Sequence, residues 1–355
     1  MTGRAHNPAA DDLESALSKS PDSYAQKLDL IRLRALFIRF SEADYRAASF
    51  LDDRILGPTT RGSWLAFDRA AAALRHAQFP QPVHYVLHTG HVGSTLVSRL
   101  LDESRVVLSL REPLPLRTLA EAHDVVESRE SLLSPAQFEL VADLVLASWR
   151  RGYASTKCVV VKATSSAARV APALLRRSET SRAIYLSLRA GPYLTALLAG
   201  PNSWQDLRGH AVERMRRLSS LVAAPIAPLH ALSPGELAAM SWLAESLTRT
   251  QIAGQFPART LALDFDAFLA DVTSSMARIF SHFGIAMEQA WLERVVASPV
   301  LGQYSKAPEH EFNPALRAEI MRDARRQHRV EIDRGMRWLE VLGRAEKSVA
   351  CVLDT

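Results

Sequence analysis

A short segment with two glycines and two hydroxyl side chains separates a strand pattern from a helix pattern. Residues 84–89 read as a strand, residues 96–101 read as a helix, and the linking residues are Gly90, His91, Val92, Gly93, Ser94 and Thr95. A helix that begins at such a turn directs free backbone N–H groups and its positive end toward one point. The glycines allow close approach and left-handed dihedrals, and the hydroxyls add donors. The segment predicts an oxyanion site, although a tight turn without a ligand has the same pattern.

Three further side chains that could do chemistry follow strand patterns. Lys162 and Arg189 each come directly after a run rich in apolar, β-branched or aromatic residues, and Glu112 follows another such run after one intervening residue, Arg111. In an open parallel sheet, ligands bind at the carboxyl ends of the strands. We therefore expect a carboxylate that can accept a proton and two cations that can neutralise an anion at the edge where the glycine segment begins. Ordinary surface charges would give the same pattern.

The glycine segment resembles the phosphate loop of the sulfotransferase family. In that family a basic residue and a variable position precede Gly-Ser/Thr-Thr at the start of a helix, which matches residues 91–95 here. The resemblance extends from about residue 83 to the loop that ends near residue 313. It implies a P-loop sulfotransferase-like fold and a donor, 3′-phosphoadenosine 5′-phosphosulfate (PAPS), whose sulfuryl group moves to a hydroxyl or amine of a small-molecule or peptide acceptor.

The layout is most similar to the protein-tyrosine sulfotransferase branch, and this similarity implies three catalytic residues. Glu112 matches the glutamate that removes the acceptor's proton, and Lys162 matches the lysine that touches the transferred group. His91 stands where the family usually has lysine or arginine, so we include it as a third candidate.

The resemblance also implies contacts to the rest of the donor, beyond those of residues 90–95. Arg189 matches an arginine that binds the 3′-phosphate, but the serine that completes this contact in the family is Leu197 here, with Thr195 two residues earlier. Ser305 and Lys306 lie in the position of a family segment that closes on the nucleotide, and they could supply the missing contacts. The set of donor-binding candidates is Gly90, His91, Val92, Gly93, Ser94, Thr95, Arg189, Thr195, Ser305 and Lys306.

Two other functions compete with sulfuryl transfer. A P-loop kinase that uses Mg-ATP would employ Glu112 to orient a metal and Asp264 to hold it, but no lysine precedes Ser94 as a Walker A sequence requires. A non-catalytic protein of the same fold would explain the departures at His91, Leu197 and Phe265. We expect no metal, because the 11 histidines form no ligand pattern and sulfuryl transfer needs none.

The pattern of apolar runs predicts an α/β fold with three layers. The expected central sheet is mostly parallel, has about five strands and is flanked by helices. The strand candidates are residues 83–88, 106–110, 158–161, 183–188 and 260–265. We expect this P-loop domain to span residues 81–345 with a helical insert at about 203–255, of which Ser233 caps one helix.

Before this domain we expect a flexible polar lead and a helical N-terminal extension. Residues 1–22 are polar, and residues 23–80 contain apolar side chains at helical spacing, with Leu30, Leu33, Phe37 and Phe40 on one face and a second helix at 63–76. The extension is expected to pack on the P-loop domain.

Composition and charge limit the class of protein. The chain has 355 residues, 48% of them apolar, and a net charge of +5, which suits an anionic ligand and predicts no nucleic-acid binding. Cys158 and Cys351 are too few for a disulfide framework, which predicts a cytoplasmic protein. There is no apolar signal segment and no stretch long enough to span a membrane.

Overall fold

The computed structural model describes residues 8–77, 80–200, 203–303 and 313–354. The chain forms two compact units, and each of them is assembled from several stretches of sequence. The first unit consists of Met1–Val86, Val97–Ala163 and Arg169–Arg182, and the second consists of Leu87–Leu96, Thr164–Ala168 and Ala183–Thr355. The domain boundaries expected at residues 81 and 345 stay predictions.

Five strands form one sheet in the order β5-β6-β4-β7-β8. Their bounds are Val83–His88 for β4, Val107–Arg111 for β5, Cys158–Lys162 for β6, Ala183–Ser187 for β7 and Thr260–Asp264 for β8. Strands β4 and β5 pair in parallel with β6, and β7 pairs in parallel with β8. Strands β4 to β7 are buried along their whole length, as expected of a parallel sheet covered on both faces. The predicted α/β class is confirmed, and every expected strand agrees within one residue at each end.

The N-terminal region is not the mainly helical extension that the sequence predicts. Three antiparallel strands pair in the order β1-β2-β3, with bounds Ser23–Asp29, Arg34–Arg39 and Gly62–Ala66. The expected helix over residues 30–40 is wrong, because the Asp29 side chain accepts from the Arg32 N–H at 2.9 Å and Leu33 has φ 49°, so the chain turns there. The second expected helix is confirmed in part, since α3 covers Phe67–Leu74 after β3.

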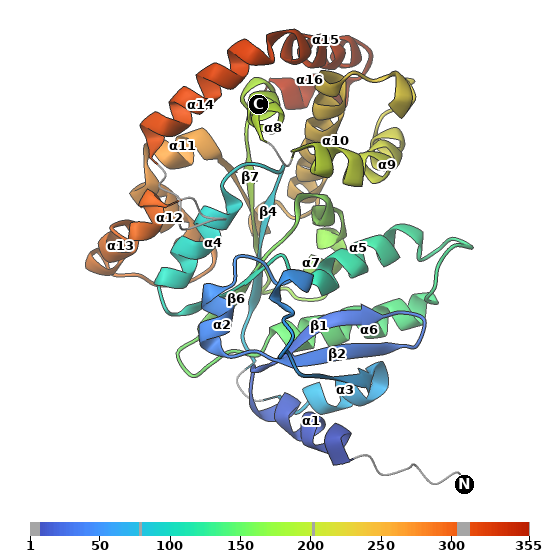
Figure 1. Cartoon of the computed structure of the whole chain (residues 1–355), viewed down its shortest axis with the longest axis vertical. Helices are drawn as coiled ribbons and strands as arrows, with labels where there is room; N and C mark the ends of the chain where they lie inside the picture. The colour runs from blue at the N-terminus through green and yellow to red at the C-terminus, as the bar shows by residue number, and fades with distance from the viewer. Residues whose placement is uncertain (1–7, 78–79, 201–202, 304–312, 355) are drawn as a thin grey trace. The chain divides into compact units, whose positions relative to one another are not determined.

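Helix α1, Pro8–Lys19, replaces most of the expected flexible lead. It packs against α3 in the first unit, as Figure 1 shows. Leu17 is fully buried, and Arg69 Nε lies 2.5 Å from Glu14 Oε1. Although this stretch is polar on average, its helix has one apolar face. One such face is sufficient for an amphipathic helix to pack on the protein.

The remaining helices of the first unit follow or connect its strands. Their bounds are Glu42–Ala47 for α2, Ser94–Glu103 for α4 (whose first turn belongs to the second unit), Leu114–Val125 for α5, Pro135–Trp149 for α6 and Ala171–Arg176 for α7, with a short 3-10 helix at Asp53–Ile55. Pro135 at the first position and Ser134, which accepts from the Gln137 N–H, start α6.

The second unit is mostly helical outside β7 and β8. Its helices are α8 (Ala190–Ala199), α9 (Ser203–Leu221), α10 (Pro234–Gln255), α11 (Phe265–Ala270), α12 (Val272–His282), α13 (Gln289–Val296), α14 (Pro314–Gln327), α15 (Arg329–Ala345) and α16 (Lys347–Leu353). The expected helical insert corresponds to α9 and α10, and Ser233 caps α10 as predicted. Within the part of the chain that the structure describes, no helix has the length and apolar content needed to cross a membrane.

Helices α10 and α15 pack closely because glycines remove side chains from their contact. A Cβ atom on Gly235 would lie 1.8 Å from the carbonyl oxygen of Glu331, and one on Gly335 would lie 2.4 Å from the carbonyl oxygen of Gly235. Figure 1 shows α15 and α16, in red, beside α10. These two glycines therefore set the spacing of the helices.

We expect Gly235→Ala to lower the free energy of unfolding by about 1–3 kcal/mol, because the added methyl group meets backbone that cannot move alone. Gly254→Ala, in the last turn of the same helix, has open space around its Cβ position and should be neutral or stabilise by about 0.5–1 kcal/mol. Urea denaturation of both variants measures the difference. Equal effects would show that the two helices do not depend on this contact.

Candidate functional site

Residues 90–95, here named the glycine loop, carry left-handed backbone between β4 and α4. Gly90 has φ 99°, His91 has φ 52° and Gly93 has φ 65°, and α4 begins at Ser94. Left-handed residues that alternate with ordinary ones turn successive N–H groups toward one side and form an anion-binding concavity. Such backbone is costly for a side chain like that of His91, and it is found most often at functional sites.

The first turn of α4 contains a hydroxyl that is buried without a partner. Thr95 is 2% exposed, and its Oγ1 atom makes no hydrogen bond to any residue that the structure describes. Ser94, next to it, is also buried. A buried hydroxyl normally has a partner, because an unpaired one costs free energy. An oxyanion bound at the helix N-terminus would provide an acceptor, so these residues fit a phosphate or sulfate group.

Three other parts of the second unit lie against the glycine loop. A Cβ atom on Gly93 would lie 2.1 Å from the ring of Phe265, at the start of α11. A Cβ atom on Gly90 would lie 3.5 Å from both Ser165 Oγ and Tyr193 Oη. The Gly90 N–H donates to His88 Nδ1 at 3.0 Å. The loop therefore needs glycine at both positions, at Gly93 because of contact and at Gly90 because of its dihedral angle.

A buried network of charges lies behind Ser165. Arg214 donates from Nη2 to Ser165 Oγ at 3.3 Å, from Nε to Glu245 Oε1 at 3.2 Å and from Nη1 to Asp206 Oδ2 at 2.9 Å. Arg217 shares the same carboxylate, with Nη2 at 2.9 Å from Glu245 Oε1. Arg214 and Glu245 are both fully buried, and their mutual pairing is what makes this burial tolerable.

The same network reaches the side chain of His91. Burial alone would raise the pKa of Asp206, but Arg214, with smaller contributions from His91 and His210, holds that pKa below its ordinary value. For Glu245, burial acts in the same direction and is outweighed by Arg217 and Arg214, so its pKa is also lowered. Both carboxylates therefore stay ionised.

In the first unit, Glu112 and Lys162 form an ion pair at the carboxyl ends of β5 and β6. Lys162 is 1% exposed and Glu112 12% exposed by side chain. Glu112 has φ 52°, and its N–H donates to the Lys162 carbonyl oxygen at 2.7 Å. A non-glycine residue in this conformation needs support from its surroundings.

Arg111 supplies that support. Its guanidinium is fully buried, pairs with Asp102 and donates to the carbonyl oxygens of Ala48 at 2.7 Å and Tyr45 at 2.6 Å. The Arg111 carbonyl oxygen accepts from the Leu51 N–H at 2.7 Å. Arg111, the residue before Glu112, thereby joins the end of α2 and the segment after it to the end of β5 through hydrogen bonds.

The remaining predicted donor-binding residues belong to the second unit or lie outside the described residues. Arg189 is exposed at the N-cap of α8. Thr195 is buried, and its hydroxyl donates to the Gly191 carbonyl oxygen at 2.9 Å, so its expected phosphate contact stays a prediction that requires this bond to break. Ser305 and Lys306 lie outside the described residues. Asp264, the candidate metal ligand of a kinase, accepts from the Ala267 N–H at 2.9 Å and caps α11.

Sequence reasoning missed Ser165, Tyr193 and Arg214 as neighbours of the glycine loop. A run of hydroxyl residues after β6, at positions 164–166, was the signal for Ser165. The contact of Phe265 with Gly93 has no signal in the sequence, which shows Phe265 only as a departure from the family pattern. Among the described residues, no group of three or more His, Cys, Asp or Glu side chains is placed to hold a metal.

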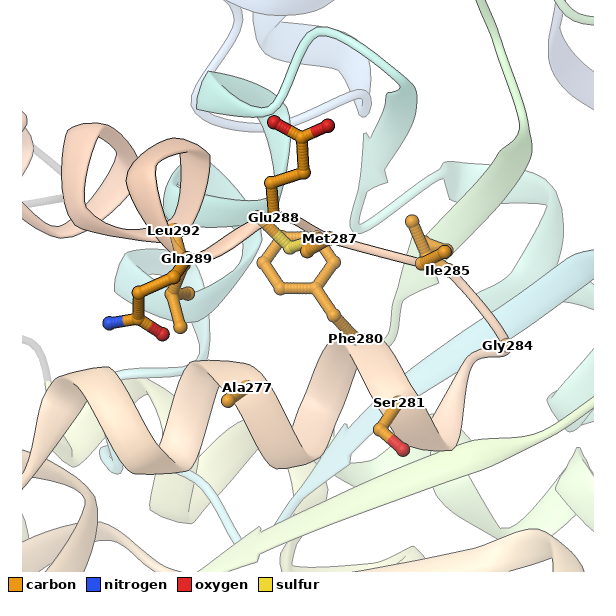
Figure 2. A pocket seen from close by; sticks show the side chains of 10 residues that line it. Ala277, Phe280, Ser281, Gly284, Ile285, Met287, Glu288, Gln289 and Leu292 are labelled. Atoms are coloured by element: carbon orange, nitrogen blue, oxygen red, sulfur yellow. The ribbon is translucent and has the colours of Figure 1, made fainter.

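A separate pocket of about 370 Å³ lies beside α12 and the segment that leads into α13. Figure 2 shows the apolar side chains of Phe280, Ile285, Met287 and Leu292 around it. The polar side chains of Glu288 and Gln289 also line it. None of the predicted site residues that the structure describes lines this pocket.

We expect Gly93→Ala to destabilise the protein by about 1–3 kcal/mol, since the new methyl group would overlap the Phe265 ring and residue 93 is left-handed. Gly191→Ala, which meets open space, is the matched control. Urea denaturation should also show a smaller cost of Gly93→Ala in a Phe265→Ala background. The same cost in both backgrounds would mean that Phe265 does not fix the loop.

Solved structures of sulfotransferases are similar to this chain. They include the sulfotransferase domain from the curacin biosynthetic pathway, at 14% identity and a TM-score of 0.40 over 70% of this chain and 97% of that chain. Sulfotransferase STF9 from Mycobacterium avium has 12% identity and a TM-score of 0.39 over 92% and 98%. Mouse sulfotransferase SULT7A1, complexed with PAP, has 9% identity and a TM-score of 0.39 over 80% and 93%. No protein-family model and no curated protein matches the chain.

Proposed function

We propose that this protein is a sulfotransferase that binds the 5′-phosphosulfate of PAPS with its glycine loop. The observation that carries the proposal is the buried, unpartnered Thr95 hydroxyl at the start of a helix entered through left-handed backbone. Backbone N–H groups, the helix end and two hydroxyls suit an oxyanion, and no Walker lysine is present for a nucleoside triphosphate.

In the proposed reaction an acceptor hydroxyl attacks the sulfur of PAPS. Glu112 takes the proton, the acceptor oxygen bonds to sulfur, and the bond between sulfur and the bridging phosphate oxygen breaks. Adenosine 3′,5′-bisphosphate leaves with the electron pair of that bond. The loop N–H groups, Ser94 and Thr95 stabilise charge on the donor oxygens.

Lys162 has two parts in this proposal. Before donor binding it pairs with Glu112, the proposed general base. During transfer its charge neutralises the sulfuryl oxygens. His91 adds a positive charge to the loop when it is protonated. Arg189 is the proposed partner of the 3′-phosphate, with Ser305 and Lys306 as further candidates.

Adenosine 3′,5′-bisphosphate should bind without magnesium, and Thr95→Val should weaken this binding about 10- to 100-fold, the value of one hydrogen bond to a charged group. The variant should not lower the melting temperature of the ligand-free protein, because the hydroxyl has no partner to lose. Isothermal titration and thermal unfolding measure the two effects. Thr118→Val, which removes a hydroxyl bonded only within α5, is the control.

A different ligand preference would contradict the proposal. Binding of Mg-ATP without binding of the bisphosphate would assign the loop to a kinase. Binding of neither nucleotide would leave a non-catalytic protein of this fold.

Glu112→Gln should abolish sulfation and leave bisphosphate affinity nearly unchanged, since glutamine cannot accept the proton but keeps an oxygen for Lys162. Transfer from radiolabelled PAPS to a panel of phenols, sugars and tyrosine peptides measures activity. Glu139→Gln, which changes an exposed glutamate paired with Arg177, serves as the control. Equal losses of sulfation and of bisphosphate binding in Glu112→Gln would make Glu112 a structural residue.

A further inference from the structure

Ser165 presents a hydroxyl to the glycine loop and is oriented by a buried arginine. It is 4% exposed, and its Oγ atom lies 3.5 Å from the position that a Cβ atom on Gly90 would occupy. Arg214 Nη2 donates to the same Oγ atom at 3.3 Å. The serine therefore connects the charged network of α9 and α10 to the loop.

The direction of this hydrogen bond leaves the Ser165 hydrogen available. A guanidinium has five N–H donors and no acceptor, so Ser165 must accept from Arg214. Among the described residues, no acceptor for the Ser165 hydroxyl hydrogen is present. A hydroxyl that accepts from a cation is polarised and becomes a stronger donor.

Arg214 is fixed well enough to hold Ser165 in one position. Glu245 accepts from its Nε atom at 3.2 Å, and Asp206 accepts from Nη1 at 2.9 Å and from Nη2 at 3.5 Å. Nη2 donates to Ser165 as well, at 3.3 Å. The pairing with Asp206 and Glu245 also raises the pKa of Arg214 against the effect of burial, which would lower it. The polarising charge is therefore permanent.

Gly90 leaves space beside this hydroxyl. Tyr193 Oη lies at the same distance from the Gly90 Cβ position, 3.5 Å, but it is paired with Ser241 Oγ at 3.0 Å. Either atom of that pair could be the donor, whereas Ser165 accepts from Arg214 and keeps its hydrogen whichever way the Tyr193 bond runs.

We propose that Ser165 is a further oxyanion-binding residue beside the glycine loop. Its hydroxyl donates to a phosphosulfate oxygen of the donor, and Arg214 holds the serine in place. The inference rests on the proposed function, because it takes the loop as the donor site. It assigns to the helical insert a part in donor binding, through Arg214 of α9.

The test is titration of adenosine 3′,5′-bisphosphate into matched variants. Ser165→Ala should lower its affinity about 10- to 100-fold, and Ser165→Cys, which keeps the size but donates weakly, should lose most of the same affinity. Thr248→Val is the control, because it removes a hydroxyl that Arg217 holds at 2.6 Å in the same network but away from the loop. It should bind within about twofold of the wild type, since no loop contact changes.

Arg214 is tested through Ser165. Arg214→Lys should weaken bisphosphate binding in the wild-type background and have little further effect in the Ser165→Ala background, as expected when one residue acts through the other. Wild-type affinity in both Ser165 variants, with the wild type binding the bisphosphate, would overturn this inference alone. Failure of the wild type to bind the bisphosphate would overturn the proposed function and this inference with it.

Discussion

The left-handed backbone at residues 90, 91 and 93 is the constraint on which the candidate site depends. It turns the chain from β4 into α4, and glycine at positions 90 and 93 leaves two of the loop residues without a side chain. Such a turn does not hold itself, because a histidine in this conformation is strained. The strain is offset by neighbours in the same unit: Phe265 fills the space that glycine leaves at position 93, and Ser165 and Tyr193 lie against position 90. A small change of shape in these neighbours therefore moves the donors of the loop.

Buried charged side chains in both units also hold other residues in position. Without them these residues would be held less firmly. In the first unit, Arg111 bonds the segment after α2 to the end of β5 and so supports the left-handed Glu112. In the second unit, Arg214 joins α9, α10 and Ser165. A guanidinium suits this task, since its planar fork reaches several oxygens at once and its charge does not depend on pH in the physiological range. Each arginine is paired with a carboxylate, without which its burial would be prohibitive.

The parts of this fold that could be predicted from sequence are those with a local cause. The five central strands are continuous apolar runs. The start of α10 is predicted by four consecutive residues that begin with the capping residue Ser233. The N-terminal sheet was missed because apolar residues in a short hairpin also satisfy helical spacing, and only the Asp29 turn distinguishes the two. In the candidate site, the glycine loop could be located from its residue types, whereas the contact between Arg214 and Ser165 joins positions 49 residues apart and leaves no local pattern. That Thr95 lacks a partner is likewise a property of three-dimensional packing.

The sharing of one carboxylate by two arginines limits how this chain can change over evolutionary time. Glu245 accepts from both Arg214 and Arg217 in a fully buried position. Loss of the glutamate removes a carboxylate from two cations and leaves only Asp206 for Arg214 and Glu213 for Arg217, while loss of one arginine leaves Glu245 with a single arginine partner. A single substitution therefore cannot replace this charged cluster by a well-packed apolar one. We expect the three positions to change together or not at all. In proteins that descend from this chain, we expect Arg214, Arg217 and Glu245 to be kept as a set. Their joint replacement is expected only after other substitutions have made this part of the core accessible to water.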